Sequence, residues 1–228
     1  MIIKVPNHVS FIMDGNSSWA KTNNKPIMQG YLKGMRTMAD TILWAKEFGI
    51  RYTTFYAFSF ENWERPKAWV KDFMALAMQF FKNDDSINKI LDAGAKLIVI
   101  GNISKLDPEF RDILVNYELK TKTSNEIVVC LAISYGGRDE IVRAAKKMAE
   151  IGLEFTEESF SANLDTAGIP DPDMMIRTSF KERISNFLLW QHSYTEFYFS
   201  KLYWPDFNKQ ELETAINCFS KRDRTYGK

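Results

Sequence analysis

Polar residues that can bind anions or metals follow several apolar runs of this chain. Asp14 comes directly after the run "HVSFIM", and Gly15 allows a tight turn before Asn16. If the residues from Ser17 onward begin a helix, its free backbone N–H groups attract phosphate. A carboxylate beside a phosphate needs a bridging cation, for which Mg²⁺ is the usual choice. The segment therefore predicts an Mg²⁺–diphosphate site, and a plain Asp-Gly turn is the alternative.

A second group of anion-binding side chains lies late in the chain. Arg177 ends a predicted strand, and Arg183 and Ser185 follow just before an apolar segment that we expect to be a helix. Two guanidinium groups and a hydroxyl at a helix N-terminus form a good diphosphate receptor. Surface ion pairs are the alternative for the arginines. Glu196 lies in an aromatic run, so if buried it must form a salt bridge or bind a metal.

A third polar segment, residues 57–66, follows another apolar run and supplies Ser59, Asn62 and Arg65. The chain offers no Ser-His-Asp set, no P-loop and no dinucleotide-binding motif. Aromatic residues make up 14% of the chain, and there are 10 methionines. A well-filled core is one explanation of this surplus, and the lining of an apolar cavity is another. Together with the anion-binding groups, the second predicts a diphosphate attached to an apolar tail.

These groups need a scaffold that brings the ends of several strands together. Short apolar runs alternate with amphipathic segments, which is typical of strands alternating with helices. We expect one α/β domain over residues 1–228, with a mostly parallel sheet flanked by helices. In such folds, ligands bind beyond the carboxyl ends of the strands. The predicted strands are 8–13, 52–58, 95–101, 126–134 and 173–179, and the predicted helices are 31–48, 67–91, 108–121, 137–152, 156–163 and 209–219.

The composition excludes several classes of protein. Lys and Arg number 30 against 29 Asp and Glu, which argues against a nucleic-acid binder held by phosphate electrostatics. Two histidines are too few for a zinc site, and Cys130 and Cys218 are expected to be buried thiols in a reducing cytoplasm. No stretch approaches the roughly 18 apolar residues of a spanning helix, and the N-terminus does not fit a signal peptide. We expect a soluble cytoplasmic protein.

Six motifs occur in an order and spacing found together in one enzyme family. They are "HVSFIMDGNSSWAK", "YAFSFENWERP", "SYGGRDEI", "IRTSFKERISNFLLWQHSYTEFYF", "WPDF" and "KRDRTYG". They resemble the cis-prenyltransferase family of isoprenyl transferases, which includes undecaprenyl diphosphate synthase, over about residues 7–227. The resemblance implies a homodimer with one parallel sheet per subunit and a hydrophobic tunnel. It also implies ionisation of an allylic diphosphate, attack by an alkene and loss of a proton, with Mg²⁺ and arginines stabilising the departing diphosphate.

The resemblance also implies roles for individual residues. Mg²⁺ is held by Asp14 and Glu196, and Asp14, Asn16 and Asn62 are catalytic. The C-terminal tail, residues 219–228, reaches the site of the partner subunit. Isopentenyl diphosphate binds the two late arginines and their neighbouring serine. The implied substrate-binding residues are Gly15, Trp19, Tyr31, Ser59, Arg65, Arg177, Arg183, Ser185, Arg222, Arg224 and Gly227.

The chain departs from the family pattern mainly on the allylic side. The usual Gly-Arg after Asp-Gly-Asn is Ser17-Ser18, a second phosphate-binding arginine is replaced by Ile27, and the usual histidine by Tyr31. The usual Gly-Gly-Glu is replaced at residues 179–181. Each lost charge-assisted contact is worth about 1.5–3 kcal/mol. Two lost contacts should weaken allylic binding or rate about 10²- to 10⁴-fold.

Three hypotheses follow. The first is a prenyltransferase of short isoprenoid diphosphates (dimethylallyl, geranyl or farnesyl, and isopentenyl), forming short chains or coupling head-to-middle like the similar lavandulyl and cyclolavandulyl diphosphate synthases. Bulky Met35, Trp69 and Phe73 at implied tunnel positions favour a short cavity, with local repacking as the alternative. The second is a regular cis-polyprenyl diphosphate synthase that uses isopentenyl diphosphate. The third is a non-catalytic subunit of a prenyltransferase complex. Peripheral membrane contact is expected only if the product is long.

Overall fold

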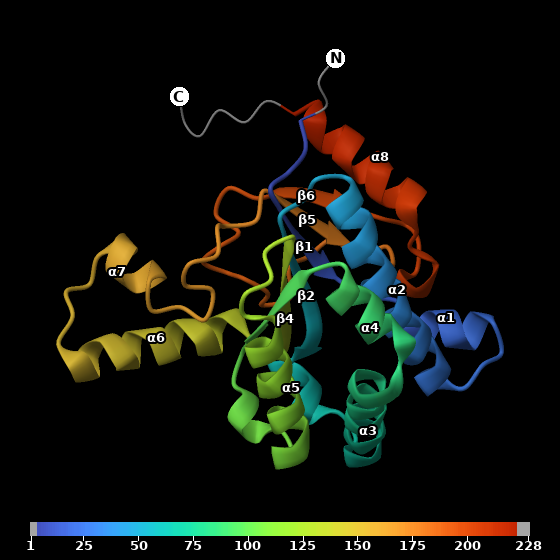
Figure 1. Ribbon diagram of the computed structural model, residues 1–228, viewed down its shortest axis with the longest axis horizontal. Helices are drawn as coiled ribbons and strands as arrows, with labels where there is room; N and C mark the ends of the chain where they lie inside the picture. The colour runs from blue at the N-terminus through green and yellow to red at the C-terminus, as the bar shows by residue number, and fades with distance from the viewer. Residues whose placement is uncertain (1–3, 223–228) are drawn as a thin grey trace.

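The computed structural model describes residues 4–222 (Figure 1). Within this range six strands form one sheet in the order β3-β4-β2-β1-β5-β6, and every neighbouring pair is parallel. The expected parallel α/β fold is therefore confirmed. The strands are β1 (His8–Ile12), β2 (Tyr52–Ser59), β3 (Ala95–Ile100), β4 (Ile127–Tyr135), β5 (Met174–Arg177) and β6 (Glu196–Phe199).

Helices connect the strands, as parallel pairing requires. The α-helices are α1 (Asn16–Thr22), α2 (Ile27–Glu47), α3 (Lys67–Asn83), α4 (Asp85–Asp92), α5 (Pro108–Thr121), α6 (Gly137–Ile151), α7 (Glu157–Ser161) and α8 (Lys209–Ser220), and the 3₁₀ turns are η1 (Phe60–Glu64), η2 (Ile103–Lys105) and η3 (Trp204–Asp206). Helices α2, α3, α4, α5 and α8 contribute to the larger apolar core with one face of the sheet. Helix α6 extends away from the body of the molecule, with α7 beside it (Figure 1). None of the helices in residues 4–222 is long and apolar enough to cross a membrane.

The alternation of side chains in β1 explains how both faces of the sheet are covered. Val9 and Phe11 join the larger core, while Ile12 packs in a second cluster with Phe187 and Leu188. These last two residues belong to the irregular segment 178–195, which covers the second face. The core is thus built on both sides of the strands, as a buried parallel sheet requires.

The two histidines support this second face, and neither belongs to a group of three potential metal ligands within residues 4–222. His8 Nε2 lies 2.8 Å from Thr54 Oγ1, and His192 Nε2 lies 3.0 Å from Ser10 Oγ. Burial lowers the pKa of His8 to about 4 and that of His192 to about 3, so both rings are neutral at physiological pH. They act as packed, hydrogen-bonded core residues.

Several predicted boundaries were wrong for identifiable reasons. The expected helix 67–91 is broken at Asp84, whose backbone is extended and whose carboxylate accepts a 3.0 Å hydrogen bond from the Ser86 N–H, capping α4. Helix α2 begins at Ile27, earlier than predicted, and strand β6 was not predicted. Cys130 is buried as expected, but Cys218 is exposed, because it lies on the outer side of α8.

The helix predicted after Ser185 was also wrong, because the segment forms successive turns. Ser185, Asn186 and Leu188 have φ angles of +49°, +61° and +45°, outside the right-handed helical region. The adjacent residues Phe187 and Leu188 are both fully buried against the sheet. Burying them while presenting Ser185 to the strand ends requires a tight loop.

Candidate active site

A cavity of about 640 Å³ lies beyond the carboxyl ends of β1, β2 and β5, between the sheet and helices α2 and α3. Its mouth is polar, and it includes the side chains of Asp14 and Arg177. Its interior is lined by aliphatic and aromatic side chains, and Phe80, Phe81 and Phe110 lie among the apolar residues that line it. The volume falls within the range of roughly 300–1,000 Å³ of ligand pockets. A polar mouth and an apolar interior suit a diphosphate with an apolar tail.

Arg177 joins the early and late polar segments at this mouth. Its side chain is only 3% exposed at the end of β5. Nε and Nη2 donate to Asp14 Oδ2 over 3.0 and 2.6 Å, and Nη1 donates to Ser185 Oγ over 2.9 Å and to the Arg183 carbonyl. The guanidinium fixes Asp14 and the loop around Ser185 in one constellation, as charge-assisted bonds do. The Arg183 side chain itself is exposed and is not among the residues lining the cavity.

Tyr31 organises the other side of the mouth. Its hydroxyl accepts hydrogen bonds from Ser17 Oγ at 3.2 Å and from Arg65 Nη1 at 3.1 Å. Its ring meets Trp69 and Phe73 edge-on, with centroids 5.5 and 5.4 Å away. The Arg65 guanidinium lies 4.1 Å above the Trp69 ring, a cation–π arrangement. Ser17 thus positions a tyrosine and an aromatic wall.

The residues around Asp14 fit a magnesium ion. Asn16 lines the same cavity; its Nδ2 donates to the Met13 carbonyl over 2.9 Å, and its buried Oδ1 has no hydrogen-bond partner among residues 4–222. A Cβ at Gly34 would lie 2.1 Å from this oxygen, so α2 needs glycine there. The Asp14 carboxylate at the mouth suits Mg²⁺, which proteins commonly hold through one or two carboxylates together with substrate phosphates, whereas the Asn16 oxygen is turned toward α2.

Glu196 and Asp14 lie at opposite ends of the parallel strands, Glu196 at the amino ends and Asp14 at the carboxyl ends. Glu196 pairs in register with Met174, whereas Phe199 pairs with Arg177. Glu196 therefore lies about 10 Å along the strand from the level of Arg177. Its Oε2 accepts a 2.7 Å hydrogen bond from Arg222 Nη1, so Glu196 does form a salt bridge, but with Arg222 rather than with Arg177 or Arg183. The single chain does not bring Asp14 and Glu196 together, and no cluster of three potential ligands occurs within residues 4–222.

The other predicted site residues lie in four different places. Gly15, with φ of +111°, Ser59 and Asn62 line the cavity, and Asn62 Oδ1 accepts from the Ser59 N–H over 3.0 Å. Trp19 is not among the lining residues, and its Nε1 donates to Asp206 Oδ1 over 2.8 Å. Arg222 lies at Glu196. Arg224 and Gly227 lie outside the described residues.

Sequence reasoning missed Tyr56, Glu61 and Asn186, which also line the cavity. Tyr56 OH donates to the carbonyls of Tyr135 and Ser185 over 3.2 and 3.4 Å. Burial, assisted by the charge of Glu61, raises the pKa of Tyr56, so it remains a donor. Their positions beside motif residues were the available signal: Glu61 precedes Asn62, and Asn186 follows Ser185.

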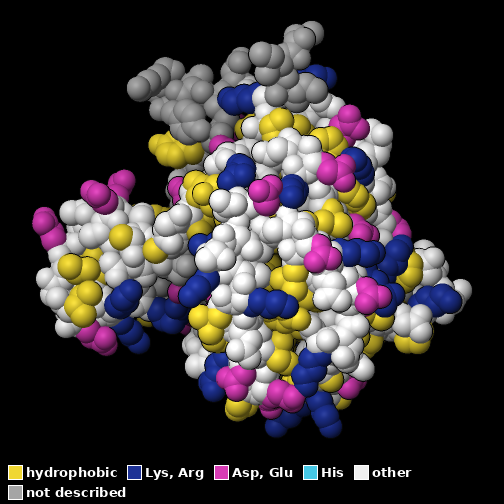
Figure 2. All heavy atoms as spheres, viewed as in Figure 1, with side chains coloured by type: hydrophobic (Ala, Val, Ile, Leu, Met, Phe, Trp, Pro, Cys, Tyr) yellow, Lys and Arg dark blue, Asp and Glu magenta, His cyan; other side chains and the backbone are white. Residues whose placement is uncertain are grey.

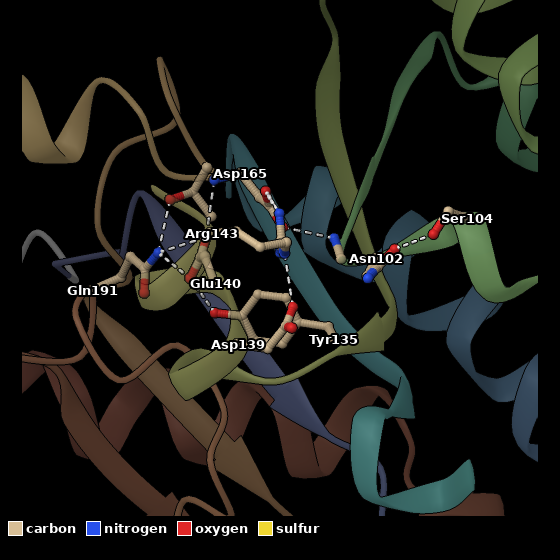
Figure 3. Close-up of polar contacts among 10 residues, drawn as sticks. Asn102, Ser104, Tyr135, Asp139, Glu140, Arg143, Asp165 and Gln191 are labelled. Atoms are coloured by element: carbon tan, nitrogen blue, oxygen red, sulfur yellow. Dashed lines mark hydrogen bonds and ion pairs between the residues drawn. The ribbon is translucent and has the colours of Figure 1, made fainter. Parts of the chain in front are cut away.

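A buried network holds the late segment against α6 (Figure 3). Glu140, which is 1% exposed, accepts hydrogen bonds from the Tyr135 hydroxyl, from Gln191 Nε2 at 3.1 Å and from the Asp165 N–H at 3.0 Å. Burial raises the pKa of Glu140 above its ordinary value. Arg143 pairs with Asp165 on the adjacent side. Through Gln191, the network fixes the later part of the segment 178–195, and Ser185 lies in the earlier part of the same segment.

Comparison with known proteins identifies the family. The family model for putative undecaprenyl diphosphate synthases, Prenyltransf, matches residues 12–227. The chain belongs to this family. An isoprenyl transferase of Aquifex pyrophilus is 40% identical over 100% of this chain and 98% of its own length. A ditrans,polycis-undecaprenyl-diphosphate synthase of Micrococcus luteus, (2E,6E)-farnesyl-diphosphate specific, is 38% identical over 98% of this chain and 92% of its own.

Solved structures extend the similarity to the fold of this prenyltransferase. A lavandulyl diphosphate synthase from Lavandula x intermedia, in complex with dimethylallyl diphosphate, superposes with a TM-score of 0.93 at 31% identity, covering 98% of this chain and 99% of that one. A probable undecaprenyl diphosphate synthase from Campylobacter jejuni superposes with a TM-score of 0.84 at 37% identity, covering 99% and 100%. The resemblance seen in the motifs is confirmed, and the protein is a prenyltransferase enzyme.

Proposed function

We propose that this prenyltransferase couples short isoprenoid diphosphates, with Mg²⁺, into a short-chain or head-to-middle product. The observation that carries the proposal is the cavity of about 640 Å³, whose polar mouth leads into a wall of Tyr31, Trp69 and Phe73. Met35 lines the same space. These bulky side chains leave room for a drug-sized ligand rather than for a long polyprenyl chain.

The proposed roles follow from the contacts at the mouth. Arg177 and Ser185 bind the diphosphate of the attacking substrate, with Arg183 nearby. Arg65, held by Tyr31, binds on the allylic side, where Asn62 lies. Asp14 would hold Mg²⁺, which supplies positive charge to the departing diphosphate, and Asn16 lies beside it. The apolar interior excludes water, so a carbocation formed there is attacked by the alkene rather than hydrolysed.

We also propose a homodimer that works in the cytoplasm. Glu196 and Asp14 of one chain lie at opposite ends of the strands. Glu196 could therefore reach only an ion that is held by Asp14 of a second copy of the chain. Arg222 contacts Glu196, so a Glu196 that approaches the partner's Asp14 would bring the tail 219–228 to the mouth of the partner's cavity. Cys130 and Cys218 are both free thiols, which suits a reducing compartment.

Regular synthesis of a polyprenyl diphosphate is the second candidate, favoured by the retained Arg177–Ser185 set and by the farnesyl-specific relative. The test is product analysis by mass spectrometry after incubating the protein and Mg²⁺ with dimethylallyl, geranyl or farnesyl diphosphate, with and without isopentenyl diphosphate. Product from an allylic diphosphate alone supports head-to-middle coupling. A strict requirement for isopentenyl diphosphate with a short product supports regular short-chain synthesis. A long product contradicts the proposal, and binding without any product indicates a non-catalytic subunit.

Phe81 is expected to limit the length of the product. Its ring lines both the cavity and a surface cleft of about 270 Å³ between α3 and α5. Phe81→Ala should open the cavity onto this cleft, so the product should gain at least one isoprene unit by mass spectrometry. Phe80→Ala is the control, because Phe80 lines the cavity without reaching the cleft and its truncation costs a similar stability, about 3–5 kcal/mol. Identical products from the two variants would contradict this role.

Restoring the missing positive charge should tighten allylic binding. Ser18 lies at the mouth, and Ile27 is a 39% exposed residue at the start of α2. The double variant Ser18→Arg/Ile27→Arg should lower the Kd of geranyl diphosphate by about 10²-fold, since each charge-assisted bond adds about 1.5–3 kcal/mol. Isothermal titration calorimetry measures the change, with Ser18→Gln/Ile27→Gln as the uncharged control. An unchanged Kd would mean that the allylic diphosphate lies elsewhere.

A further inference from the structure

Asn186 ties the loop that carries Ser185 to two other elements. Its Oδ1 accepts from the Arg138 N–H over 2.9 Å, and its carbonyl accepts from the Gly137 N–H over 2.7 Å, so it caps the start of α6. Its Nδ2 donates to Glu61 Oε1 over 2.6 Å. An N–H can only donate and a carboxylate can only accept, so the partners fix the orientation of the amide.

The backbone at this position is equally specific. Asn186 has a φ of +61° beside Ser185 at +49°, a left-handed conformation that asparagine tolerates better than most residues. A Cβ at Gly136 would lie 2.8 Å from the Asn186 Nδ2, so the chain at α6 approaches the amide closely. Such a conformation persists where surrounding contacts over-determine it, as they do here.

The Asn186–Glu61 hydrogen bond joins two segments that line the cavity. On one side, Ser185 and the Arg183 carbonyl contact Arg177. On the other side, Glu61 lies in η1, between β2 and the Arg65 that contacts Tyr31. Both Glu61 and Asn186 line the cavity. The contact therefore links the wall assigned to the attacking diphosphate with the wall assigned to the allylic one.

We propose that Asn186 is a positioning residue, and that its bond to Glu61 sets the separation of the two diphosphate half-sites. This inference rests on the proposed function for the assignment of the half-sites. Asn186 itself need not touch the substrate. It acts by holding Ser185 against Arg177 and by keeping η1 at a fixed distance from that loop.

Exchange of donor and acceptor tests the proposal without requiring turnover. Asn186→Asp keeps the acceptor for Arg138 but cannot donate to Glu61, and it adds a negative charge. Asn186→Asp/Glu61→Gln reverses the hydrogen bond and restores the native charge of the pair. Asn186→Asp/Glu61→Ala has the same charge without the bond. The readout is the Kd of isopentenyl diphosphate by calorimetry, with inorganic diphosphate as a second probe.

We expect Asn186→Asp to weaken binding by about tenfold or more, as loss of a hydrogen bond to a charged group does. The reversed pair should recover to within about threefold of the native Kd, and the Asn186→Asp/Glu61→Ala variant should not recover. Glu61→Ala alone leaves the α6 cap intact and should weaken binding even if the Asn186 variants fold poorly. Thermal unfolding of each variant separates loss of positioning from loss of fold.

Equal binding by the reversed pair and by Asn186→Asp/Glu61→Ala would show that charge alone matters and would overturn the inference. Native affinity in Asn186→Asp or in Glu61→Ala would overturn it as well. A native protein that binds isopentenyl diphosphate but forms no product contradicts only the proposed function, because the binding comparison remains readable. Failure of the native protein to bind either probe would overturn both.

Discussion

Asp14→Ala should lower the turnover number by about 10³-fold or more. The carboxylate lies at the cavity mouth, where it would hold Mg²⁺ and where it accepts two hydrogen bonds from Arg177. Removing one group that stabilises developing charge typically costs about 10²–10³ in rate, and loss of a metal ligand adds to this. The measurement is steady-state product formation at several Mg²⁺ concentrations. Saturating Mg²⁺ should not restore the rate.

Two variants sharpen the Asp14 experiment. Asp14→Asn keeps an oxygen that can accept from Arg177 but removes the charge, so it should remain impaired if metal binding is the role. Glu47→Ala removes an exposed carboxylate that pairs with Lys209 at the far end of α2, and it should retain native turnover. Native turnover in Asp14→Ala would refute the assignment of the metal to this residue.

Arg177→Lys should weaken the binding of isopentenyl diphosphate by about 10²-fold. The native guanidinium, 3% exposed, donates to Asp14, to Ser185 Oγ and to the Arg183 carbonyl at once. A lysine carries one compact ammonium and cannot reproduce this planar fork. Part of this hydrogen bonding would be lost, and each hydrogen bond to a charged group is worth about 1.5–3 kcal/mol, so the melting temperature should also fall.

Calorimetry and thermal unfolding measure both effects of Arg177→Lys. Arg51→Lys is a suitable control, because Arg51 also donates to backbone carbonyls, those of Asn125 and Glu126. Arg51 is exposed and lies at the amino ends of the strands, away from the cavity. The Arg51→Lys variant should leave the Kd unchanged. If Arg177→Lys binds isopentenyl diphosphate with native affinity, Arg177 does not belong to the diphosphate receptor.

The regular elements were predictable because their periodicity is local. The strand 8–13 and the helix 137–152 follow from apolar spacing alone, and the structure places β1 and α6 there with shifts of one residue at the ends. Polar residues follow several of the strands, and they predicted that the site lies at the carboxyl ends of the sheet. The break at Asp84 was missed because the apolar stripe continues across it, and only the capping contact to Ser86 interrupts the helix.

The parts that sequence did not predict depend on contacts between distant segments. Asp14 and Arg177 lie 163 residues apart along the chain, and Glu61 and Asn186 lie 125 apart. The motifs indicated that Asp14 and Arg177 belong to the site, but they did not predict the hydrogen bonds between these two side chains. Glu196 was paired with Asp14 through the family pattern, yet the register of β6 determines that it lies at the other end of the strands. Apolar residues after Ser185 suggested a helix, whereas their burial against the sheet requires a loop.

Ser17 and Ser18 separate into two roles. Ser17 donates to the Tyr31 hydroxyl and so supports the aromatic wall, which the substitution pattern alone did not indicate. Ser18 is exposed at the mouth and marks a place where positive charge is absent. The first observation fits the short cavity that we propose, and the second fits the weak binding of the allylic diphosphate that we propose.

The most direct test of the account is the carbon number of the longest product made by the native protein. Mass spectrometry after prolonged incubation with farnesyl or dimethylallyl diphosphate, Mg²⁺ and excess isopentenyl diphosphate gives this value. A cavity of about 640 Å³, with Phe81 between it and the cleft of α3 and α5, predicts a product that stops after few isoprene units. Accumulation of a long polyprenyl diphosphate, or absence of any product, would contradict the account.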